Sequence, residues 1–300
     1  MKNFVNNTCG LIVTYQPDFA VLRATISSLA LNVDEILIYD NASNTADMSM
    51  QVLDAMDNVT VFYSNENIGI AEAQNLLLTE AISRGYKFAV MSDQDTVYPA
   101  QFVGTLIKYF DNAPKVAVVC PGWIDKNLGE AGKYTGQYVF KQCGVLKIDH
   151  RTDRAFKIAH AISSGMVIKL GLIDKIGLMR GDLFIDWVDN EWCWRINSLG
   201  FTVLGVPSVK IEHTLGDKTV SILGRNFVVR SSNRNYYIVR NALALMLSKS
   251  IPLAARIYLM KKVLHHSIFC LLASENKKSD LIVVIKAFWH GINGRLGQIR

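Results

Sequence analysis

Two carboxylates stand one residue apart where an apolar run ends, in the stretch "FAVMSDQD", which closes on Asp93, Gln94 and Asp95. Residues i and i+2 of an extended segment point to the same side, so Asp93 and Asp95 can converge on one cation. Oxygen ligands of this kind suit Mg²⁺ or Mn²⁺ rather than zinc. Beside a nucleotide, such an ion stabilises the charge of a departing diphosphate. The alternative is a turn at the end of the strand that an aspartate side chain caps, which would explain the same sequence without a metal ion.

A second acidic cluster lies in "RGDLFIDWVDNEWCWRINSLGF", which continues into an amphipathic helix expected to stop at Gly200. Its four acids fall within ten residues: Asp182, Asp186, Asp189 and Glu191. Asp189 and Glu191 would suit the start of that helix as a cap and a first-turn acid, because the helix dipole favours them there. Three tryptophans crowd the same stretch: Trp187, Trp192 and Trp194. Aromatic faces beside carboxylates suit a sugar site, and partial burial could raise a carboxylate pKa towards that of a working base.

The first half of the chain alternates between two patterns. Strand-like runs cover 9–15, 34–40, 59–63, 87–92 and 116–120. Helix-like segments lie near 18–31, 45–57, 69–84 and 100–112, the third of them followed by Gly85 as a C-terminal stop. Near-continuous apolar strands separated by helices indicate βαβ units and a parallel sheet buried on both faces. The sequence therefore predicts an α/β fold of the nucleotide-binding type.

Polar side chains follow each of the first four predicted strands. They are Thr14-Tyr15, Asp40-Asn41, Ser64-Asn65 with Asn67 close behind, and Asp93-Gln94-Asp95. Ligands of open α/β sheets bind outside the carboxyl ends of the strands. Loops are polar in any protein, but four successive ends of this kind favour a site for a base, a ribose or a metal ion.

Two further stretches could complete such a site. "AHAISSGMVIKLGLIDKIG" indicates a strand followed by a short helix, and Ser163, Ser164 and Gly165 would let backbone and hydroxyls approach a ligand closely. His213 follows the predicted strand "VPSVKIE" and could supply a neutral nitrogen to a metal. Without other context, a single histidine of this kind is a surface residue or one already satisfied by a hydrogen bond.

Composition narrows the class of protein. The 300 residues are 50% hydrophobic and 19% charged, which fits a folded chain of one large domain or two small ones. The first residues, "MKNFVNNTCG", do not have the pattern of a signal peptide. The five cysteines are scattered and lack Cys-x-x-Cys spacing, which favours a reducing compartment and argues against structural zinc. We therefore expect a cytoplasmic protein.

The charge is unevenly distributed along the chain. From Lys218 to Arg300 there are 14 Lys/Arg against two Asp/Glu, whereas the preceding part has 18 against 24. Within this basic tail, 251–270 places apolar residues on one helical stripe: Leu253, Ile257, Met260 and Leu264. The other side of that helix carries Lys261, Lys262, His265 and His266. A basic amphipathic helix suits the surface of an anionic membrane; the alternative is a helix packed on the domain with a solvated basic face.

Taken together, these stretches resemble the inverting family 2 glycosyltransferases of GT-A fold, and within them the bacterial rhamnosyltransferase branch of surface-polysaccharide assembly. The matching stretches follow the family's order from residue 9 to 241: "LIVTYQPD", "ILIYDNASN", "NENIGIAEAQN", "MSDQD", "SSGMVI", "DWVDNEWCWR", "HTLGD" and "RNYYIVRN". The resemblance implies a Rossmann-like catalytic domain over 1–217, with a nucleotide-binding part at about 1–120 and an acceptor part at about 121–217. The basic, mostly helical region 218–300 would follow it.

The resemblance also implies roles for individual residues. The nucleotide-sugar would be held by Thr14, Tyr15, Asp40, Asn67, Gly69, Asp93 and Gln94, with Arg234 and Arg240 near the diphosphate. Asp93 and Asp95 match a metal pair for Mg²⁺ or Mn²⁺, with His213 as the third ligand. Asp189 matches the catalytic base, and Glu191 remains the alternative because Val188 stands where the family has glutamate. The acceptor or sugar side would include Ser164, Gly165, Trp187 and Trp192.

The implied reaction moves L-rhamnose from dTDP-L-rhamnose to a hydroxyl of a glycan acceptor. We expect this acceptor to be lipid-linked and to belong to O-antigen or capsule synthesis. The reaction would take place at the inner face of the cell membrane. A galactosyl- or glucosyltransferase is the alternative among such enzymes. A nucleotidyltransferase usually has a Gly-rich loop after its first strand, where this chain has "TYQPDFA". A dehydrogenase is disfavoured because G-x-G-x-x-G is missing. A nucleic-acid-binding protein is disfavoured by the acidic body and the lack of a binding signature; a sugar-binding homologue without activity is disfavoured by the intact acids.

Overall fold

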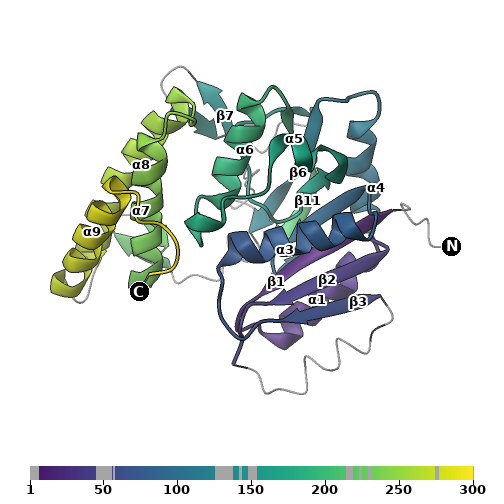
Figure 1. The fold of residues 1–300 in the computed structure, drawn as a ribbon, viewed down its shortest axis with the longest axis horizontal. Coiled ribbons are helices and arrows are strands. Elements are labelled where there is room, and N and C mark those ends of the chain that lie inside the picture. Colours follow the sequence, from purple (N-terminus) through teal and green to yellow (C-terminus); the bar gives the residue numbers. More distant parts are fainter. Residues whose placement is uncertain are drawn as a thin grey trace.

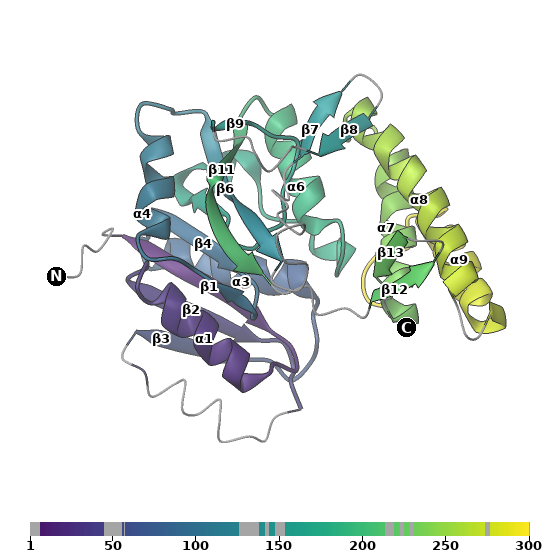
Figure 2. The same ribbon diagram turned by 180° about the vertical axis from the view of Figure 1, so that it is seen from behind.

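A computed structural model describes residues 7–44, 56, 58–125, 138–141, 144–147, 154–213, 219–222, 225–228, 231–273 and 277–299. A twisted central sheet forms the body of the molecule, with helices on both of its faces (Figures 1 and 2). Three C-terminal helices form a separate layer at one end of this body, seen in yellow-green in both views.

The first four long strands form a parallel sheet, as their apolar runs predict. They are β1 (Thr8–Thr14), β2 (Glu35–Asp40), β3 (Val59–Tyr63) and β4 (Phe88–Ser92), and they lie in the order β3-β2-β1-β4. Neighbouring strands in this half are parallel, with Thr14 opposite Asp40 and Asp40 opposite Tyr63. The carboxyl ends of these strands therefore meet at one edge of the sheet, where the polar residues gather.

The sheet continues with strands from the second half of the chain. After β4 come β10 (Val167–Lys169), β6 (Val116–Asp125), β11 (Thr202–His213) and the short β5 (Thr96–Val97), while β9 (Phe156–Lys157) pairs with β11. The three-residue β10 runs antiparallel to both β4 and β6. This insertion carries the serine-glycine segment 163–165 to the end of β4, beside Asp93.

Alternating residues of the strands build a core on each face of the sheet. Leu11 and Leu37 join the cluster beneath α3 (Ile70–Ser83), whereas Ile12, Ile36 and Ile38 join the cluster beneath α1 and α4. Helix α1 (Phe19–Leu29) begins where the Asp18 carboxylate accepts hydrogen bonds from two backbone N–H groups. The predicted 100–112 helix is shorter: α4 (Phe102–Ile107) tightens into the 3₁₀ turn η1 (Lys108–Phe110). The helix expected near 45–57 lies almost wholly outside the described residues.

The second half of the body contains short elements around one longer helix. After β10 come η3 (Leu170–Leu172) and α5 (Ile173–Ile176), as the expected strand and short helix; then follow η4 (Gly181–Leu183) and α6 (Val188–Ser198). Gly200 (φ +83°) follows α6, as predicted. Two small hairpins are also present, β7–β8 (Tyr138–Lys141, Gly144–Lys147) and β12–β13 (Thr219–Ile222, Arg225–Val228).

The C-terminal helices share the core of the body. They are α7 (Ser232–Leu247), α8 (Leu253–Ala273) and α9 (Lys277–Ile292). Tyr236 and Leu245 of α7 and Leu259 of α8 belong to the same buried cluster as Trp194 of α6. Residues on both sides of the expected 217/218 boundary therefore form one continuous core.

Helix α8 does not pack through the stripe that its sequence pattern singles out. Leu253, Met260 and Leu264 of that stripe are exposed, whereas Ala255 and Leu259 are buried. Helix α8 therefore does pack on the domain, as the alternative expectation has it, but through a face other than the apolar stripe. None of the helices in the described part of the chain is sufficiently long and apolar to cross a bilayer.

Candidate active site

Buried hydrogen bonds organise the ends of β1 and β2. Thr14 Oγ1 donates to Asp40 Oδ1 at 2.9 Å. The same carboxylate accepts hydrogen bonds from the backbone N–H and the hydroxyl of Ser43, at 3.0 and 2.6 Å. Thr14 and Asp40 are both buried. These contacts hold the two strand ends together and fix the loop that follows β2.

Amide side chains link the other strand ends. Gln94 Oε1 accepts from Tyr15 N at 3.0 Å, and Gln94 Nε2 donates back to Tyr15 O. Asn67 Oδ1 accepts from Asn41 Nδ2 at 3.0 Å and from Gly69 N at 2.9 Å. The ring of Tyr15 is exposed at this edge, so its face is open to a stacking ligand. The structure therefore brings all these predicted donor-site residues together at one edge of the sheet.

The segment 163–165 braces the turn that carries the paired aspartates. Asp93 N donates to Ser164 Oγ, which lies 2.6 Å from Thr96 Oγ1. Gly165 N donates to Met91 O at 2.7 Å, and its φ of +80° favours glycine. Ser164 is completely buried. The prediction that Ser164 contacts the acceptor is therefore wrong; it positions Asp93 instead.

The strand β5 places a third metal-ligand type beside the pair. Thr96 is opposite His213 in the antiparallel β5–β11 pair, so the backbone of His213 lies across from the residue that follows Asp95. The side chain of His213 lies outside the described residues, and among the described side chains no group of three or more histidine, cysteine or acidic residues is arranged to hold a metal ion. The set of two carboxylates and one imidazole across neighbouring strands fits Mg²⁺ or Mn²⁺.

Asp189 lies in the first turn of α6 and is half-buried. Oδ1 accepts from Asn190 N at 2.8 Å and Oδ2 from Ser163 N at 3.2 Å. Burial raises the pKa of Asp189 to about 7, and the negative charges of Asp93 and Asp186 add to the increase. Because Asp93 acts on Asp189 electrostatically, the structure brings the turn after β4 and the expected base into one region.

The backbone just before Asp189 is strained. Phe184, Asp186 and Trp187 have φ values of 66°, 63° and 67°, a region that residues other than glycine rarely adopt. Asn241 Nδ2 of α7 donates to the carbonyls of Leu183 and Ile185, both at 2.8 Å. Asn241 therefore holds the strained loop that presents Asp189, a role that the "RNYYIVRN" motif did not reveal.

Helix α3 is fastened to the segment that leads into the strained loop. Ile70 N donates to Phe184 O at 2.8 Å. Asn75 Nδ2 donates to Met179 O, and Met179 N donates to Asn75 Oδ1, both at 2.9 Å. A Cβ on Gly69 would meet Phe184 O at 2.6 Å. Gly69 therefore permits the close approach between the donor edge and the Asp189 loop.

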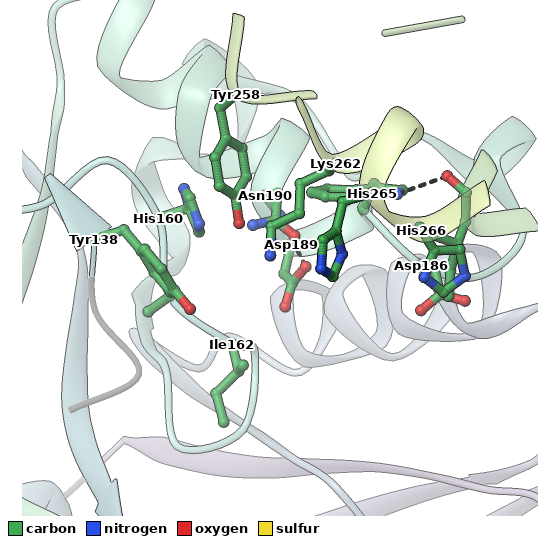
Figure 3. A pocket seen from close by; sticks show the side chains of 13 residues that line it. Tyr138, His160, Ile162, Asp186, Asp189, Asn190, Tyr258, Lys262, His265 and His266 are labelled. Carbon is green, nitrogen blue, oxygen red and sulfur yellow. Dashed lines mark hydrogen bonds between the residues drawn. The ribbon is translucent and has the colours of Figure 1, made fainter. Parts of the chain in front are cut away.

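A cavity of about 370 Å³ opens beside Asp189 (Figure 3). Trp187 and Asp189 form part of its wall, together with Tyr138, His160 and Tyr258, which come from distant parts of the chain. This size and this mixture of aromatic and polar groups are typical of small-molecule sites. No motif marked Tyr138, His160 or Tyr258, because each comes from a separate element and only the fold brings them together.

His160 is a neutral group in the wall of this cavity. Trp194 Nε1 donates to His160 Nδ1 at 3.0 Å, and the ring of Tyr138 stacks on the imidazole with centroids 4.5 Å apart. Burial lowers the pKa of His160 to about 3, and the nearby positive charge of Lys262 lowers it further. Since Nδ1 accepts, the proton of the neutral ring is on Nε2.

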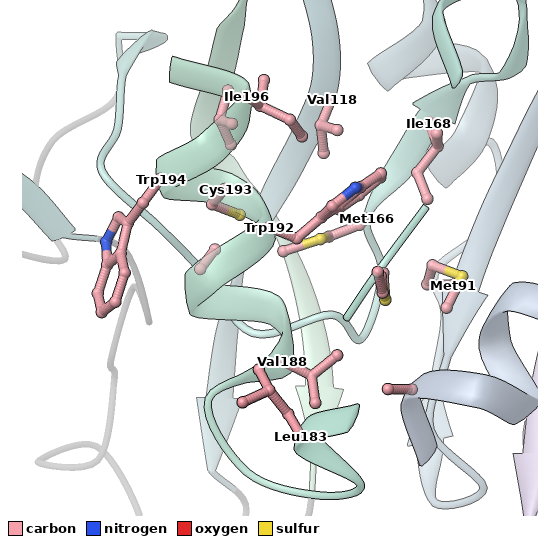
Figure 4. Close-up of a cluster of buried hydrophobic side chains, with 14 of the residues drawn as sticks. Met91, Val118, Met166, Ile168, Leu183, Val188, Trp192, Cys193, Trp194 and Ile196 are labelled. Carbon is pink, nitrogen blue, oxygen red and sulfur yellow. The ribbon is translucent and has the colours of Figure 1, made fainter. Parts of the chain in front are cut away.

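Three other predicted site residues have structural roles. Trp192 is completely buried in the core shown in Figure 4 and donates to Gly177 O at 2.8 Å, so its predicted sugar contact is wrong. Arg240 is buried and donates to Leu183 O and Asn241 Oδ1, so its predicted diphosphate contact is also wrong. The buried Glu191 pairs with Arg195 at 2.9 Å and does not line the cavity.

Arg234 and Trp187 remain at the site. Arg234 Nε lies 3.4 Å from Asp186, which lines the cavity. Trp187 Nε1 donates to Ile238 O at 2.9 Å, which fixes the indole in the wall, and Tyr258 meets it edge-on with centroids 6.1 Å apart. Trp187 therefore lines the cavity and Arg234 pairs with an acid that lines it, and their contacts with sugar and diphosphate stay predictions.

A nucleotide-binding type of sheet, with carboxylates at its strand ends and a half-buried carboxylate in a cavity wall, is the arrangement of a GT-A-type glycosyltransferase. The chain belongs to this class: the profile of "Glycosyl transferase family 2" matches residues 11–177. Among individual proteins, it is similar to the "dTDP-rhamnosyl transferase RfbF" of Shigella flexneri, with 31% identity over 294 residues that cover 97% of each chain.

Solved glycosyltransferases have the same fold. S. aureus TarS 1–349 in complex with UDP-GlcNAc matches with a TM-score of 0.60 and 14% identity, over 96% of this chain and 82% of that one. The mannosyltransferase PcManGT from Pyrobaculum calidifontis, in complex with GDP-Man and Mn²⁺, gives 0.52 and 15%, over 95% and 75%. GalNAc-T7 with UDP, GalNAc and Mn²⁺ gives 0.58 and 14%; this chain covers 56% of its length and 93% of its own. The predicted fold class is thereby confirmed, and the chain is a nucleotide-sugar-dependent glycosyltransferase.

Proposed function

We propose that this glycosyltransferase moves L-rhamnose from dTDP-L-rhamnose to a hydroxyl of a glycan acceptor, with inversion at the anomeric carbon. The observation that carries the proposal is the position of Asp189. It is a half-buried carboxylate in a cavity wall, with a pKa raised to about 7, and it lies within electrostatic reach of Asp93. The choice of rhamnose is supported by the 31% identity to a dTDP-rhamnosyl transferase.

The donor would lie across the strand ends. Tyr15, Asp40 and Asn67 would meet the base and ribose, because their side chains are gathered at this edge. Asp93 and Asp95, with His213 from the neighbouring strand, would hold Mg²⁺ or Mn²⁺, which supplies neutralisation of the departing diphosphate. The backbone N–H of Asp93 donates to the hydroxyl of the buried Ser164, which holds the start of the turn that carries both aspartates.

The acceptor would enter the cavity beside Asp189. Its carboxylate takes the proton from the attacking hydroxyl while the hydroxyl oxygen forms a bond to the anomeric carbon. The bond between that carbon and the diphosphate oxygen breaks, and its electron pair leaves with dTDP. Attack from the face opposite the leaving group inverts the configuration. The buried His160 stays neutral and can hold the acceptor without competing for the proton.

A panel of nucleotide-sugars tests this assignment. We expect release of nucleoside diphosphate to be fastest with dTDP-L-rhamnose and to require a divalent cation. Faster release from a UDP-sugar would replace rhamnose with galactose or glucose as the donor sugar. Full activity in EDTA would remove the metal from the assignment, and no release from any nucleotide-sugar would contradict transferase activity.

We further propose that the acceptor is lipid-linked, as in synthesis of O-antigen or capsule, and that the C-terminal helices contact an anionic membrane from the cytoplasmic side. Large apolar side chains are exposed along α8 and α9, including Leu264, Ile268, Ile285 and Trp289. Lysines 277, 278 and 286 lie on α9 among these side chains. An apolar face with interspersed cations and a tryptophan suits a membrane interface.

Flotation with vesicles tests the membrane contact. The full chain should float with vesicles that contain anionic lipid and should float less with neutral ones. Ile285→Ser together with Trp289→Ser should abolish flotation. Leu31→Ser is the matched control, because Leu31 is an exposed apolar residue beyond α1 in the body of the protein. Equal sedimentation with and without lipid would contradict this part of the proposal.

A further inference from the structure

A second cavity, of about 480 Å³, lies between α7, α9 and the residues that follow α9. Tyr236 and Arg240 of α7, His290 of α9 and residues 295–299 line it. It shares no lining residue with the cavity beside Asp189. Among the described residues at the carboxyl ends of the strands, none lines it either. The proposed transfer reaction therefore gives this second cavity no role.

The lining of the second cavity includes a buried cation, since Arg240 is only 1% exposed. Its guanidinium donates to three uncharged oxygen atoms: Asn241 Oδ1, Gly297 O and Leu183 O. A guanidinium has five N–H groups, so it can donate to a further acceptor. Asp182, whose charge acts on Arg240, does not line the cavity and pairs with Arg180 at 2.6 Å. Because burying a charge without a close counter-charge is costly, an anion in the cavity would stabilise Arg240.

Further positive charge surrounds this guanidinium. Arg295 lines the cavity, is exposed to solvent, and makes no side-chain hydrogen bond or ion pair within the described part of the chain. His290 Nδ1 lies 2.5 Å from Tyr236 Oη, a contact that fixes the imidazole in the lining. Partial burial lowers the pKa of His290, and the positive charges of Lys286, Arg295 and Arg240 lower it further. Three cations are therefore close enough to act on one imidazole, and the described lining residues include no acid.

A phosphate group matches these donors. Its oxygens can accept from guanidinium groups on different sides, and guanidinium–phosphate hydrogen bonds are among the strong ones in proteins. The cavity has room for a phosphate and a small polar group attached to it. Trp289 and Ile292, which are exposed, belong to the same last turn of α9 as His290. An apolar surface with a tryptophan beside a phosphate site is the arrangement expected for a phospholipid headgroup.

We propose that the cavity between α7, α9 and residues 295–299 is a second binding site, outside the active site, where Arg240 and Arg295 hold a phosphate group. The headgroup of an anionic phospholipid is the source that the neighbouring apolar side chains favour. The phosphate site does not depend on the transferase assignment, whereas its lipid source rests on the proposed membrane contact.

Inorganic phosphate is the first probe for this cavity. The full chain is saturated with dTDP and Mg²⁺, so that the donor edge is filled, and phosphate is titrated by calorimetry. We expect phosphate to bind alongside dTDP. Arg295→Met should weaken this binding by at least about tenfold, because a charge-assisted hydrogen bond is lost. The variant should fold normally, since the side chain of Arg295 is exposed.

Lys278→Met is the matched control. It also removes one positive charge from the C-terminal helices, on a side chain of α9 that does not line the cavity. Lys278 precedes His290 by 12 residues, or about 18 Å along the helix axis. This variant should bind phosphate as tightly as the wild type does.

A second probe identifies the source of the phosphate. Dihexanoylphosphatidylglycerol is titrated below its micelle concentration under the same conditions. Tighter binding of this lipid than of inorganic phosphate, weakened in Arg295→Met, would support the site and assign it to a phospholipid headgroup. Phosphate binding that the attached lipid does not strengthen would support the site and assign it to a soluble phosphate compound.

Three results would overturn the inference. Phosphate could fail to bind once dTDP fills the donor edge, or Arg295→Met could bind it as tightly as the wild type does. Arg295→Met and Lys278→Met could also lose affinity equally, which would show an effect of overall charge and not of a site. The proposed function is judged separately, by release of nucleoside diphosphate and by flotation with vesicles. A chain that passes both of those tests and binds no phosphate would therefore lose only this second site.

Discussion

At the scale of single residues, the pKa of Asp189 results from opposing effects. Burial and the carboxylates of Asp93 and Asp186 raise its pKa, whereas the N–H groups of Ser163 and Asn190 lower it. The resulting value of about 7 is close to the working pH that is most effective for a general base. A side chain with this value can exchange a proton with an acceptor hydroxyl at little cost.

Asp189→Asn should lower the turnover rate by at least about 100-fold and leave donor affinity nearly unchanged, because the amide cannot take the proton. Turnover and dTDP binding measured on the same preparation will check this. Asp182→Asn is the control, since Asp182 is an exposed acid paired with Arg180. Near-normal turnover in Asp189→Asn would remove Asp189 from the role of base.

The raised pKa also predicts how stability depends on pH. A carboxyl group whose pKa is 3.8 in the unfolded chain and about 7 in the folded protein holds its proton more tightly when folded. Its contribution to stability is therefore present below about pH 4 and is lost as the pH rises to about 7. Asp189→Asn should unfold at a higher temperature than the wild type at pH 8, and the difference should shrink at pH 5. A constant difference across this range would contradict the assigned pKa.

Glu191 should matter for stability more than for catalysis. Its carboxylate is buried and paired with Arg195, which also donates to two backbone carbonyls. Glu191→Gln should lower the free energy of unfolding by about 2 kcal/mol, since Arg195 loses its counter-charge. The folded variant should keep its turnover rate, as measured by urea denaturation and nucleoside diphosphate release. A large loss of turnover with stability unchanged would return Glu191 to the role of base.

Residue types and spacing were sufficient to propose Asp93, Asp95 and Asp189 as site residues, but not to separate contact residues from core residues. Glu191, Trp192, Cys193 and Trp194 are consecutive, and all are buried. A helix enclosed on all sides has no exposed face that periodicity could reveal. Trp192 was therefore predicted to contact a sugar, although its indole belongs to the core. The predicted diphosphate contact of Arg240 is wrong for a similar reason, because a sequence does not distinguish a buried guanidinium from one that binds a ligand.

At the scale of elements, Gly69 lies where the start of α3 approaches the loop before Asp189 closely. Its φ of 84° and ψ of 159° lie in a region that is essentially restricted to glycine, and a Cβ would meet Phe184 backbone atoms. Gly69→Ala should destabilise the fold by about 3 kcal/mol, because strain and overlap add. Urea denaturation will measure this.

Gly85 offers the matched comparison for that substitution. It also has a positive φ, of 79°, but a Cβ there would meet nothing within 4 Å. Gly85→Ala should therefore cost only the backbone strain, about 1 kcal/mol. Equal losses in the two variants would show that contact with Phe184 adds nothing.

The long strands were predictable because a sheet buried on both faces requires continuous apolar runs. A strand was also expected at β10, but its antiparallel position between β4 and β6 depends on partners far along the chain. The bonds of Asn241 to Leu183 and Ile185 likewise join segments more than 50 residues apart. Local patterns carry no information about pairings of this kind.

At the scale of the whole molecule, the C-terminal helices and the body should unfold together. Tyr236, Leu245 and Leu259 are buried in the cluster that also contains Trp194 and Leu183. Differential scanning calorimetry should therefore show one transition, with equal calorimetric and van't Hoff enthalpies. Two separate transitions would show that the core divides near residue 217.

The sequence indicated that the C-terminal region is basic. It did not indicate which side chains of α8 meet the body, which line the cavity and which face solvent. A helical wheel for α8 separates apolar from charged residues. It cannot show that Leu259 meets the body or that Lys262 faces Asp189, because those directions depend on where the helix docks. Tyr138, His160 and Tyr258 were missed for a related reason, since the cavity exists only after β7, α6 and α8 come together.

The bonds that join α3 to residues 179–184 also limit how the enzyme could acquire a new substrate. The Ile70–Phe184 contact and the reciprocal Asn75–Met179 pair tie the strand edge to the loop before Asp189. These two regions form a stiff frame, so the span between them is set by backbone geometry. A larger sugar could not be accommodated by spreading this frame apart. New selectivity would have to arise by trimming or replacing side chains that project into the opening, such as Tyr138 or Tyr258.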